Sequence, residues 1–324
     1  MDWPIPTLAD VLKARRLISP YLPVTPTLEP AGLASALGCR VVLKCENMSP
    51  TGAFKVRGGV NLLASLEPQL RARGVVAAST GNHGQSVAYA ARLFGCKATV
   101  FMPAAANRLK VQATAALGAE VIQIGRDFDA ARLVAEEHAA SRGLRYIHSA
   151  NEPLLVAGVG TVALELLEAA PDLDVIFVPI GAGSGALGAG TVARAVNPAI
   201  RVIGVQAEGA PAVYRSWREG RRVVTENIDT FAEGLATREP FAMPLSLLPR
   251  MVDEIMLVSD DEIAASIRIL IETAHQVVEG AGAASLAAAV QRRDELAGKN
   301  VGLIVSGGNI TIEQLKRIVL GEKP

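Results

Sequence analysis

A glycine-rich loop provides the first candidate binding site in this 324-residue chain. A branched apolar run at 175–180, typical of a buried strand, leads directly into the loop, and a helical pattern follows it. Glycines let the backbone bend tightly and point its N–H groups at a phosphate, together with the positive end of the following helix dipole. The loop residues are Gly181, Ala182, Gly183, Ser184 and Gly185.

The loop alone leaves its ligand open. Gly183, Gly185 and Gly188 match the GxGxxG pattern of dinucleotide-binding folds. Glu208 lies 20 residues after Gly188, where such folds place an acidic residue for the ribose. A dinucleotide, another phosphate ligand and a structural glycine turn are all compatible with this pattern.

Lys55 is the second candidate. It lies in SPTGAFKVRGG at 49–59, which starts as a turn and passes into a predicted helix. Most lysines are exposed surface charges. Lys55, however, has small and apolar sequence neighbours and no acidic residue nearby, conditions that can desolvate an amine and lower its pKa. Such an amine can act as a general base or form a Schiff base with a carbonyl compound.

Short strands that alternate with longer helices must position these residues. We expect strands at 40–45, 75–79, 98–102, 120–124, 145–148, 174–180, 201–206, 254–258 and 301–305. We expect helices at 85–94, 108–117, 129–141, 153–168 and 261–278. This alternation predicts βαβ units and mainly parallel sheets covered on both faces. The predicted fold class is α/β, with two doubly wound parallel-sheet domains.

The length of the chain also predicts two domains, at about 150 residues each. The segment 74–149 contains four strand–helix units, enough to close a small sheet of its own. We therefore expect a small domain at 74–149 inserted in a large domain made of 1–73 and 150–324. After Asn309 only about one helix is expected, which leaves no room for a C-terminal regulatory domain.

Composition excludes several classes of partner. Lys+Arg and Asp+Glu both number 32 and aromatic residues make up 4%, so we expect no nucleic-acid partner and no anionic membrane surface. The N-terminus lacks a signal-peptide pattern. The uncharged window 175–193 contains five glycines and is read as a strand and a tight loop, not as a membrane span. Cys39, Cys45 and Cys96 form no CxxC pair, which favours a cytoplasmic location.

Four segments resemble the fold-type II pyridoxal 5'-phosphate (PLP) enzymes, specifically the threonine/serine dehydratase and serine racemase branch with its tryptophan synthase β-like fold. They are TGAFKVRG at 51–58, STGNHGQ at 79–85, GAGSG at 181–185 and SGGN at 306–309. The ordered set spans nearly the whole chain. An NAD-dependent oxidoreductase, which leaves three of the four unexplained, is kept as the alternative from another class, beside a non-catalytic binding protein.

The resemblance implies a role for each residue that matches a motif. Lys55 would hold PLP as a Schiff base and, once displaced by substrate, take the Cα proton; Phe54 would support the ring, and the 181–185 loop would bind the cofactor phosphate. Asn82 would bond the ring hydroxyl oxygen, although an Asn before a helix is also a typical N-cap. Ser306 would bond the pyridine nitrogen. Glu279 matches a segment near the ring and would be a cofactor-binding residue, although the family often has proline where this chain has Gly280.

A turn between a strand end and a helix start would bind the substrate carboxylate. The resemblance assigns this to Ser79, Thr80, Gly81, Asn82 and His83, with His83 mainly a part of the turn. Resembling racemases have a serine at the position of Thr80, where a second acid/base would act.

The implied function is PLP-dependent dehydration and deamination of a small β-hydroxy amino acid. L-threonine would give 2-oxobutanoate and ammonia, and L-serine would give pyruvate. Serine racemase and 3-hydroxyaspartate dehydratase are the alternatives within the family. We expect a homodimer or homotetramer. Some members bind a cation near the position of Gln206 to Glu208, but no metal site is assigned, and the segment 231–238 is expected to approach the substrate.

Overall fold

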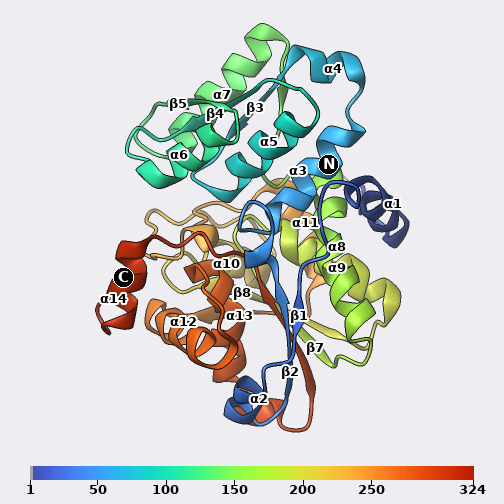
Figure 1. Ribbon diagram of the computed structural model, residues 1–324, viewed down its shortest axis with the longest axis vertical. Helices are drawn as coiled ribbons and strands as arrows, with labels where there is room; N and C mark the ends of the chain where they lie inside the picture. The colour runs from blue at the N-terminus through green and yellow to red at the C-terminus, as the bar shows by residue number, and fades with distance from the viewer. Residues whose placement is uncertain (1–2) are drawn as a thin grey trace.

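The chain folds around two separate β-sheets (Figure 1). The structure is a computed structural model that describes residues 3–324. A six-stranded sheet has the order β1-β2-β10-β7-β8-β9, and a four-stranded sheet has the order β5-β4-β3-β6. The strands are β1 Thr27–Leu28, β2 Arg40–Cys45, β3 Val75–Ala78, β4 Ala98–Met102, β5 Glu120–Gln123, β6 Arg145–Tyr146, β7 Val175–Pro179, β8 Arg201–Ala207, β9 Glu254–Val258 and β10 Asn300–Val305.

Helices follow most of the strands. The α-helices are α1 Leu8–Ile18, α2 Ala31–Leu37, α3 Lys55–Ser65, α4 Pro68–Arg73, α5 Asn82–Leu93, α6 Arg108–Ala116, α7 Phe128–Arg142, α8 Pro153–Ala169, α9 Ser184–Val196, α10 Ala212–Glu219, α11 Ala242–Met251, α12 Asp260–Ala274, α13 Gly280–Gln291 and α14 Ile312–Val319. Three short 3-10 turns are η1 Glu46–Met48, η2 Glu233–Leu235 and η3 Arg293–Leu296.

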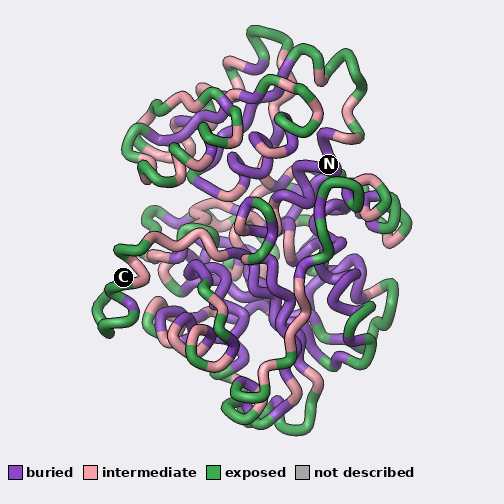
Figure 2. Tube along the Cα trace, viewed as in Figure 1, coloured by how far each residue is buried: buried purple, intermediate pink, exposed green. Residues whose placement is uncertain are grey.

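The six-stranded sheet is buried on both faces. Residues of α2, α12 and α13 form the core on one face, and residues of α8, α9 and α11 form the core on the other. All of its pairings are parallel except that of β1 with β2. The strands are accordingly continuous apolar runs that lie at the buried centre of the lower part of the molecule (Figure 2).

The four-stranded sheet is entirely parallel. Helix α5 packs on one face and α7 on the other, so each face has its own core. Both sheets lie where the sequence predicted them, and the α/β class is confirmed. The division into domains at 1–73 plus 150–324 and 74–149 stays a prediction.

The elements missed by the sequence reading have weak local patterns. Strand β1 is two residues long, and α13 begins in GAGAAS, a glycine-rich start that a helix rarely has. The predicted helix 261–278 ends early, at Ala274, because His275 adopts a left-handed conformation with φ 56°. Helix α9 begins at Ser184, inside the segment read as a loop. Among the described residues, no helix is both long and apolar enough to cross a bilayer.

A buried ionic cluster joins β2, η1, α3 and α8 next to the start of α3. The Arg57 guanidinium donates to both carboxylate oxygens of Glu46, at 2.7 and 2.8 Å, and to both of Glu165, at 2.7 Å each. Lys44 Nζ lies 2.6 Å from Glu165 Oε2. The two cations balance the two carboxylates, and every one of these side chains is at least 94% buried. The cluster ties α3 to β2 and α8.

We expect Arg57→Ala to lower the free energy of unfolding by about 3–5 kcal/mol, because it leaves Glu46 and Glu165 buried with too few partners. Urea unfolding of the purified protein measures this. The control is Arg201→Ala, which removes a half-exposed ion pair with Glu254 and should cost less than about 1 kcal/mol. Equal losses in the two variants would contradict the prediction.

Candidate active site

Lys55 is fixed by its backbone neighbours at the first residue of α3. The Phe54 N–H donates to the Ser306 carbonyl at 3.0 Å, and Ser86 Oγ donates to the Lys55 carbonyl at 2.6 Å. The lysine Nζ donates to Ser184 Oγ at 2.7 Å and to the Ser149 carbonyl at 3.4 Å. The amine is thus held between the start of α9 and the chain that leaves the four-stranded sheet.

The partners of the Lys55 amine are neutral. No carboxylate of the described residues forms an ion pair with it, and burial lowers its pKa from 10.5 to about 8. An appreciable fraction of the amine is therefore uncharged near neutral pH. An uncharged lysine amine is a nucleophile toward carbonyl groups and a base.

The predicted phosphate loop connects β7 to α9. Gly183 has φ +97°, a conformation that glycine adopts without strain. A Cβ atom on Gly181 would lie 2.1 Å from the Gly234 carbonyl oxygen, so the loop can pack this closely on Gly234 only because this side chain is absent. The first N–H groups of a helix have no partner within the helix, and here they belong to Ser184 and the residues after it. Loop and helix dipole together suit an anion.

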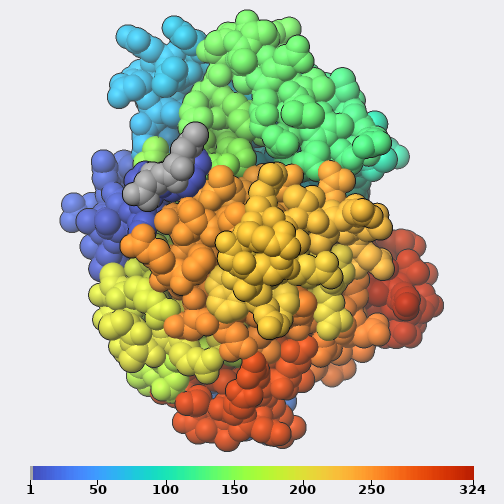
Figure 3. Space-filling view, turned by 180° about the vertical axis from the view of Figure 1, so that it is seen from behind, coloured from blue at the N-terminus to red at the C-terminus, as the bar shows by residue number. Residues whose placement is uncertain are grey.

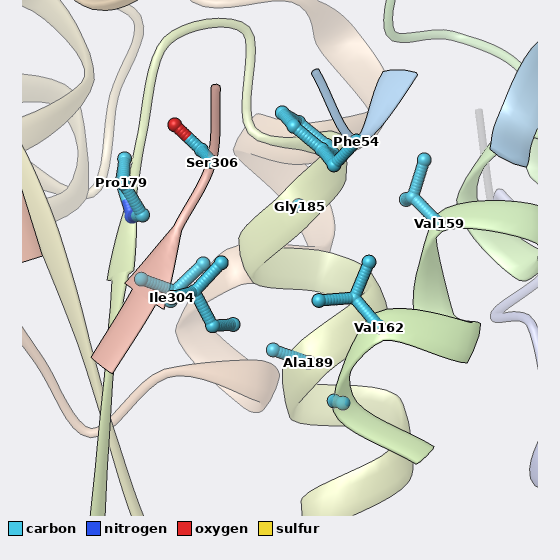
Figure 4. Close-up of a pocket in the computed structure, with 10 residues that line it drawn as sticks. Phe54, Val159, Val162, Pro179, Gly185, Ala189, Ile304 and Ser306 are labelled. Carbon is cyan, nitrogen blue, oxygen red and sulfur yellow. The ribbon is translucent and has the colours of Figure 1, made fainter. Parts of the chain in front are cut away.

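Phe54 and Ser306 line the neighbouring wall. The Phe54 ring lies over the start of α9, 3.3 Å from where a Cβ of Gly185 would be. Behind it are Val162 and Ala189, and in Figure 4 the Ser306 hydroxyl points away from these apolar groups. Ser306 is 5% exposed, and within residues 3–324 its carbonyl accepts from the Phe54 N–H while its hydroxyl forms no hydrogen bond. It is a free donor and acceptor at the edge of an apolar wall.

The predicted carboxylate-binding turn follows β3. Ser79 Oγ accepts a hydrogen bond from the Gly81 N–H at 3.0 Å and so shapes the turn itself. Thr80 is exposed and faces the cavity. Helix α5 begins at Asn82 with Gly81 as its N-cap, so the reading of Asn82 as an N-cap is wrong. The start of α5 points at the cavity, as an anion site requires.

Asn82 is oriented by two residues distant in sequence. Its Nδ2 donates to Glu279 Oε1 at 2.7 Å, and its Oδ1 accepts from Asn309 Nδ2 at 2.8 Å. Burial raises the pKa of Glu279, opposed by the charge of Lys110 and by the Asn82 hydrogen bond. Glu279 thus contacts the side-chain amide of Asn82, a residue predicted to bind the cofactor. One hydrogen on Asn82 Nδ2 stays available for a further hydrogen bond.

His83 is buried and neutral. Desolvation, together with the nearby charge of Lys55, lowers its pKa to about 3. Its Nε2 lies 3.1 Å from the Ile147 carbonyl, which fixes the ring by accepting a hydrogen bond. A histidine held in this way supports the turn and is a poor proton acceptor at neutral pH.

One cavity of about 620 Å³ gathers these residues. Every residue that the sequence predicted for the site lines it: Phe54, Lys55, Ser79, Thr80, Gly81, Asn82, His83, Gly181, Ala182, Gly183, Ser184, Gly185, Glu279 and Ser306. The sequence analysis missed the contacts made by Ser149 and Asn309 and the presence of Lys110. Glu233 belongs to the segment 231–238, which was expected to approach the substrate, and it lines the cavity. Asn309 closes the SGGN motif and could have been noted there; Ser149 and Lys110 carry no local signal.

No metal site is seen near Gln206. Its side chain is fully buried and its Oε1 accepts from the Tyr214 N–H at 2.9 Å. Within the described part of the chain, no group of three or more His, Cys, Asp or Glu side chains could hold a metal ion.

Comparison with known proteins assigns the family. Residues 18–307 match the family model described as pyridoxal-phosphate dependent enzyme. The chain is 40% identical over 313 residues to an L-threonine ammonia-lyase of Thermotoga maritima, covering 97% of this chain and 78% of that protein. It is 36% identical to an L-threo-3-hydroxyaspartate ammonia-lyase of Saccharomyces cerevisiae, covering 98% of both.

Solved structures agree with the sequence relatives. Maize serine racemase superposes with a TM-score of 0.92 at 30% identity, covering 98% of each chain. Gly188, which completed the dinucleotide pattern, packs α9 on α8, where a Cβ would lie 2.8 Å from the Gly160 nitrogen, and the family match assigns the chain to pyridoxal-phosphate dependent enzymes. The reading as an NAD-dependent oxidoreductase is therefore wrong. The chain belongs to the family of pyridoxal-phosphate dependent enzymes.

Proposed function

We propose that this protein is a lyase that converts L-threonine to 2-oxobutanoate and ammonia, and also L-serine to pyruvate. The observation that carries the proposal is the buried Lys55 amine, which shares one cavity with an anion-binding loop and a carboxylate-binding turn. The name of the relative from Thermotoga maritima, L-threonine ammonia-lyase, supports this choice of substrate.

The residues of the cavity fit the cofactor. The loop at 181–185 offers backbone N–H groups for its phosphate, and the loop packs so closely on Gly234 that a Cβ at Gly181 would lie 2.1 Å from the Gly234 carbonyl oxygen. Phe54 offers a wall for its ring, and the Ser306 hydroxyl a partner for the ring nitrogen. Asn82, oriented by Glu279 and Asn309, offers a donor for the ring hydroxyl oxygen. When bound, the cofactor supplies an aldehyde that condenses with amines and a ring that withdraws electrons from Cα.

The chain's own groups then bind substrate and move a proton. The N–H groups and hydroxyls of the turn, with the helix dipole of α5, bind the substrate carboxylate. Lys55 Nζ, uncharged in part because of its burial, accepts the Cα proton. In the net reaction the Cα–H and Cβ–O bonds break and the hydroxyl leaves as water. The enamine that is released tautomerises, and water hydrolyses it to the 2-oxo acid and ammonia.

A second candidate function is racemisation of serine. It needs an acid/base on the face of Cα opposite Lys55. The hydroxyl of Thr80 faces the cavity, and maize serine racemase is a structural neighbour. A serine hydroxyl partner for the ring nitrogen, unlike a carboxylate, does not enforce a protonated ring, so a long-lived carbanion is less stabilised. This difference favours elimination.

We further propose that the protein is a cytoplasmic homodimer or homotetramer. Met48 and Val277, large apolar residues that are 54% and 48% exposed, lie on segments joined by the bond from Asn47 Nδ2 to the Val277 carbonyl. Ile312 on α14 is 75% exposed. Exposed apolar groups of this kind are typical of surfaces covered by a second copy. Reduced cysteines fit the cytoplasm.

We expect the purified holoenzyme to form 2-oxo acids from a panel of β-hydroxy amino acids, with L-threonine the best substrate. Lys55→Ala should lose both this activity and the visible absorbance of the bound cofactor, because it removes the amine that is hydrogen-bonded to Ser184 of the loop. Keto-acid assays and absorption spectra measure these two properties. A Lys55→Ala variant that keeps both would refute the role of the lysine.

We expect Gly181→Ala to weaken cofactor binding at least about tenfold, because its Cβ must displace the Gly234 carbonyl and distort the phosphate cradle. Titration of apoenzyme with pyridoxal phosphate, followed by visible absorbance, measures the affinity. Gly298→Ala is the control: it replaces a glycine of positive φ, and so adds backbone strain, two residues before β10, at the end of the strand away from the site. Equal affinities in the two variants would exclude a cradle at Gly181.

A further inference from the structure

An ion pair crosses the cavity beside the carboxylate-binding turn. Lys110 on α6 pairs with Glu233 on η2. A Cβ atom on Gly81 would lie 3.6 Å from Lys110 Nζ, so the ammonium contacts the turn from the outside. Lys110 is therefore, besides Lys55, a cation placed where a substrate's carboxylates would lie.

Glu233 reaches Lys110 from the opposite wall. It belongs to the segment around 225–241, which lies directly against the layer of the four-stranded sheet; in Figure 3 this is the gold segment below the green one. The Lys110 side chain is 12% exposed and that of Glu233 is 40% exposed. The lysine is thus the enclosed member of the pair, and the glutamate neutralises it from the solvent side.

The cavity wall as a whole is acidic. Of the charged side chains that line it, four are cations and six are carboxylates: Lys55, Lys110, Arg126 and Arg238 against Asp127, Asp129, Glu226, Glu233, Glu239 and Glu279. Arg238 is paired with Asp129 at 2.7 Å and Arg126 with Asp127 at 3.3 Å, so the two arginines of the wall are neutralised in the same way. A second carboxylate on a substrate would find no unpaired cation beside the turn.

We infer that Glu233 sets the substrate class of the enzyme by occupying Lys110, so that β-hydroxy amino acids with an uncharged side chain are preferred over dicarboxylic ones. This inference rests on the proposed lyase function. A dicarboxylic substrate such as 3-hydroxyaspartate must either displace Glu233 from Lys110 or lie beside its negative charge. Repulsion of this kind discriminates between ligands as effectively as a new attraction does. Lys110 therefore favours a substrate with a second carboxylate, and Glu233 disfavours it.

The test compares kcat/KM for L-threo-3-hydroxyaspartate and for L-threonine in the holoenzyme. We expect Glu233→Gln to raise the ratio of the two at least about tenfold, because Lys110 is freed, and Lys110→Met to lower it. The double variant should show no gain, since the cation that Glu233→Gln exposes is gone. If both single variants change the ratio in the same direction, or neither changes it, the inference is wrong.

The matched control is Arg238→Met, which breaks the other ion pair across the cavity. If these pairs only hold the two walls together, Arg238→Met, Lys110→Met and Glu233→Gln should all affect both substrates alike. If Glu233 sets selectivity, Arg238→Met should leave the ratio within about twofold of wild type.

A binding experiment separates this inference from the lyase function. Succinate and butyrate have the same carbon chain but differ by one carboxylate, and neither can undergo elimination. We expect Glu233→Gln holoenzyme to bind succinate at least about tenfold more tightly than wild type does, with butyrate unchanged, as measured by thermal shift or calorimetry. Unchanged succinate affinity overturns the inference whether or not the enzyme turns over threonine. Tighter succinate binding with no turnover of any β-hydroxy amino acid overturns the proposed function alone.

Discussion

The site depends on keeping one amine buried without a negative partner. Placing a carboxylate beside Lys55 would stabilise the ammonium and raise its pKa, whereas burial among neutral groups lowers it to about 8. The nearest partners, the Ser184 hydroxyl and the Ser149 carbonyl, accept hydrogen bonds from the amine without a full charge. Burying an amine costs free energy, so the surrounding structure must hold it in place.

The ion pairs of Arg57 and the hydrogen bond from Ser86 hold the start of α3, and with it Lys55, in place. Arg57 lies two residues after Lys55 and is fixed by Glu46 and Glu165, while the Lys55 carbonyl accepts from Ser86. The charges of this cluster are paired and almost fully buried, and they lie away from the cavity. At the phosphate loop and the carboxylate-binding turn, anions are recognised by backbone N–H groups and helix dipoles. These groups attract a phosphate or a carboxylate without placing a charged side chain beside Lys55 that would change its pKa. The same neutrality explains how the site suits a zwitterionic amino acid.

The sequence predicted correctly those elements whose structure is determined by residues close together in the chain. The buried strands are short apolar runs, and β2 and β9 have the predicted bounds. The loop after β7 and the turn after β3 lie at carboxyl ends of parallel strands, so topology alone brings them toward one cavity. Lys55 could be singled out by its apolar neighbours. Most roles within the site, however, came from the ordered motifs and not from residue chemistry.

The rest of the site depends on contacts between residues far apart in the sequence. Asn82 and Glu279 are 197 positions apart, and Lys110 and Glu233 are 123 apart. Neither pair has a local signature: Lys110 has the pattern of a surface lysine on an amphipathic helix, and Glu233 that of a charge in a loop. The start of α5 at Asn82 was missed for a related reason, because Asn82 is held by tertiary hydrogen bonds and not by a capping pattern.

These long-range pairs divide the cavity by charge. Its inner part has the weakly basic amine, free hydroxyls and backbone dipoles, and its outer wall has acidic groups in excess over cations. A ligand with one carboxylate can place it on the turn and leave its remaining atoms among neutral groups. A ligand with two must bring the second past Glu233, which already neutralises Lys110 beside the turn. The cavity thus has a neutral inner part and an acidic outer wall. This division lets the fold discriminate between substrates by the charge on their side chains.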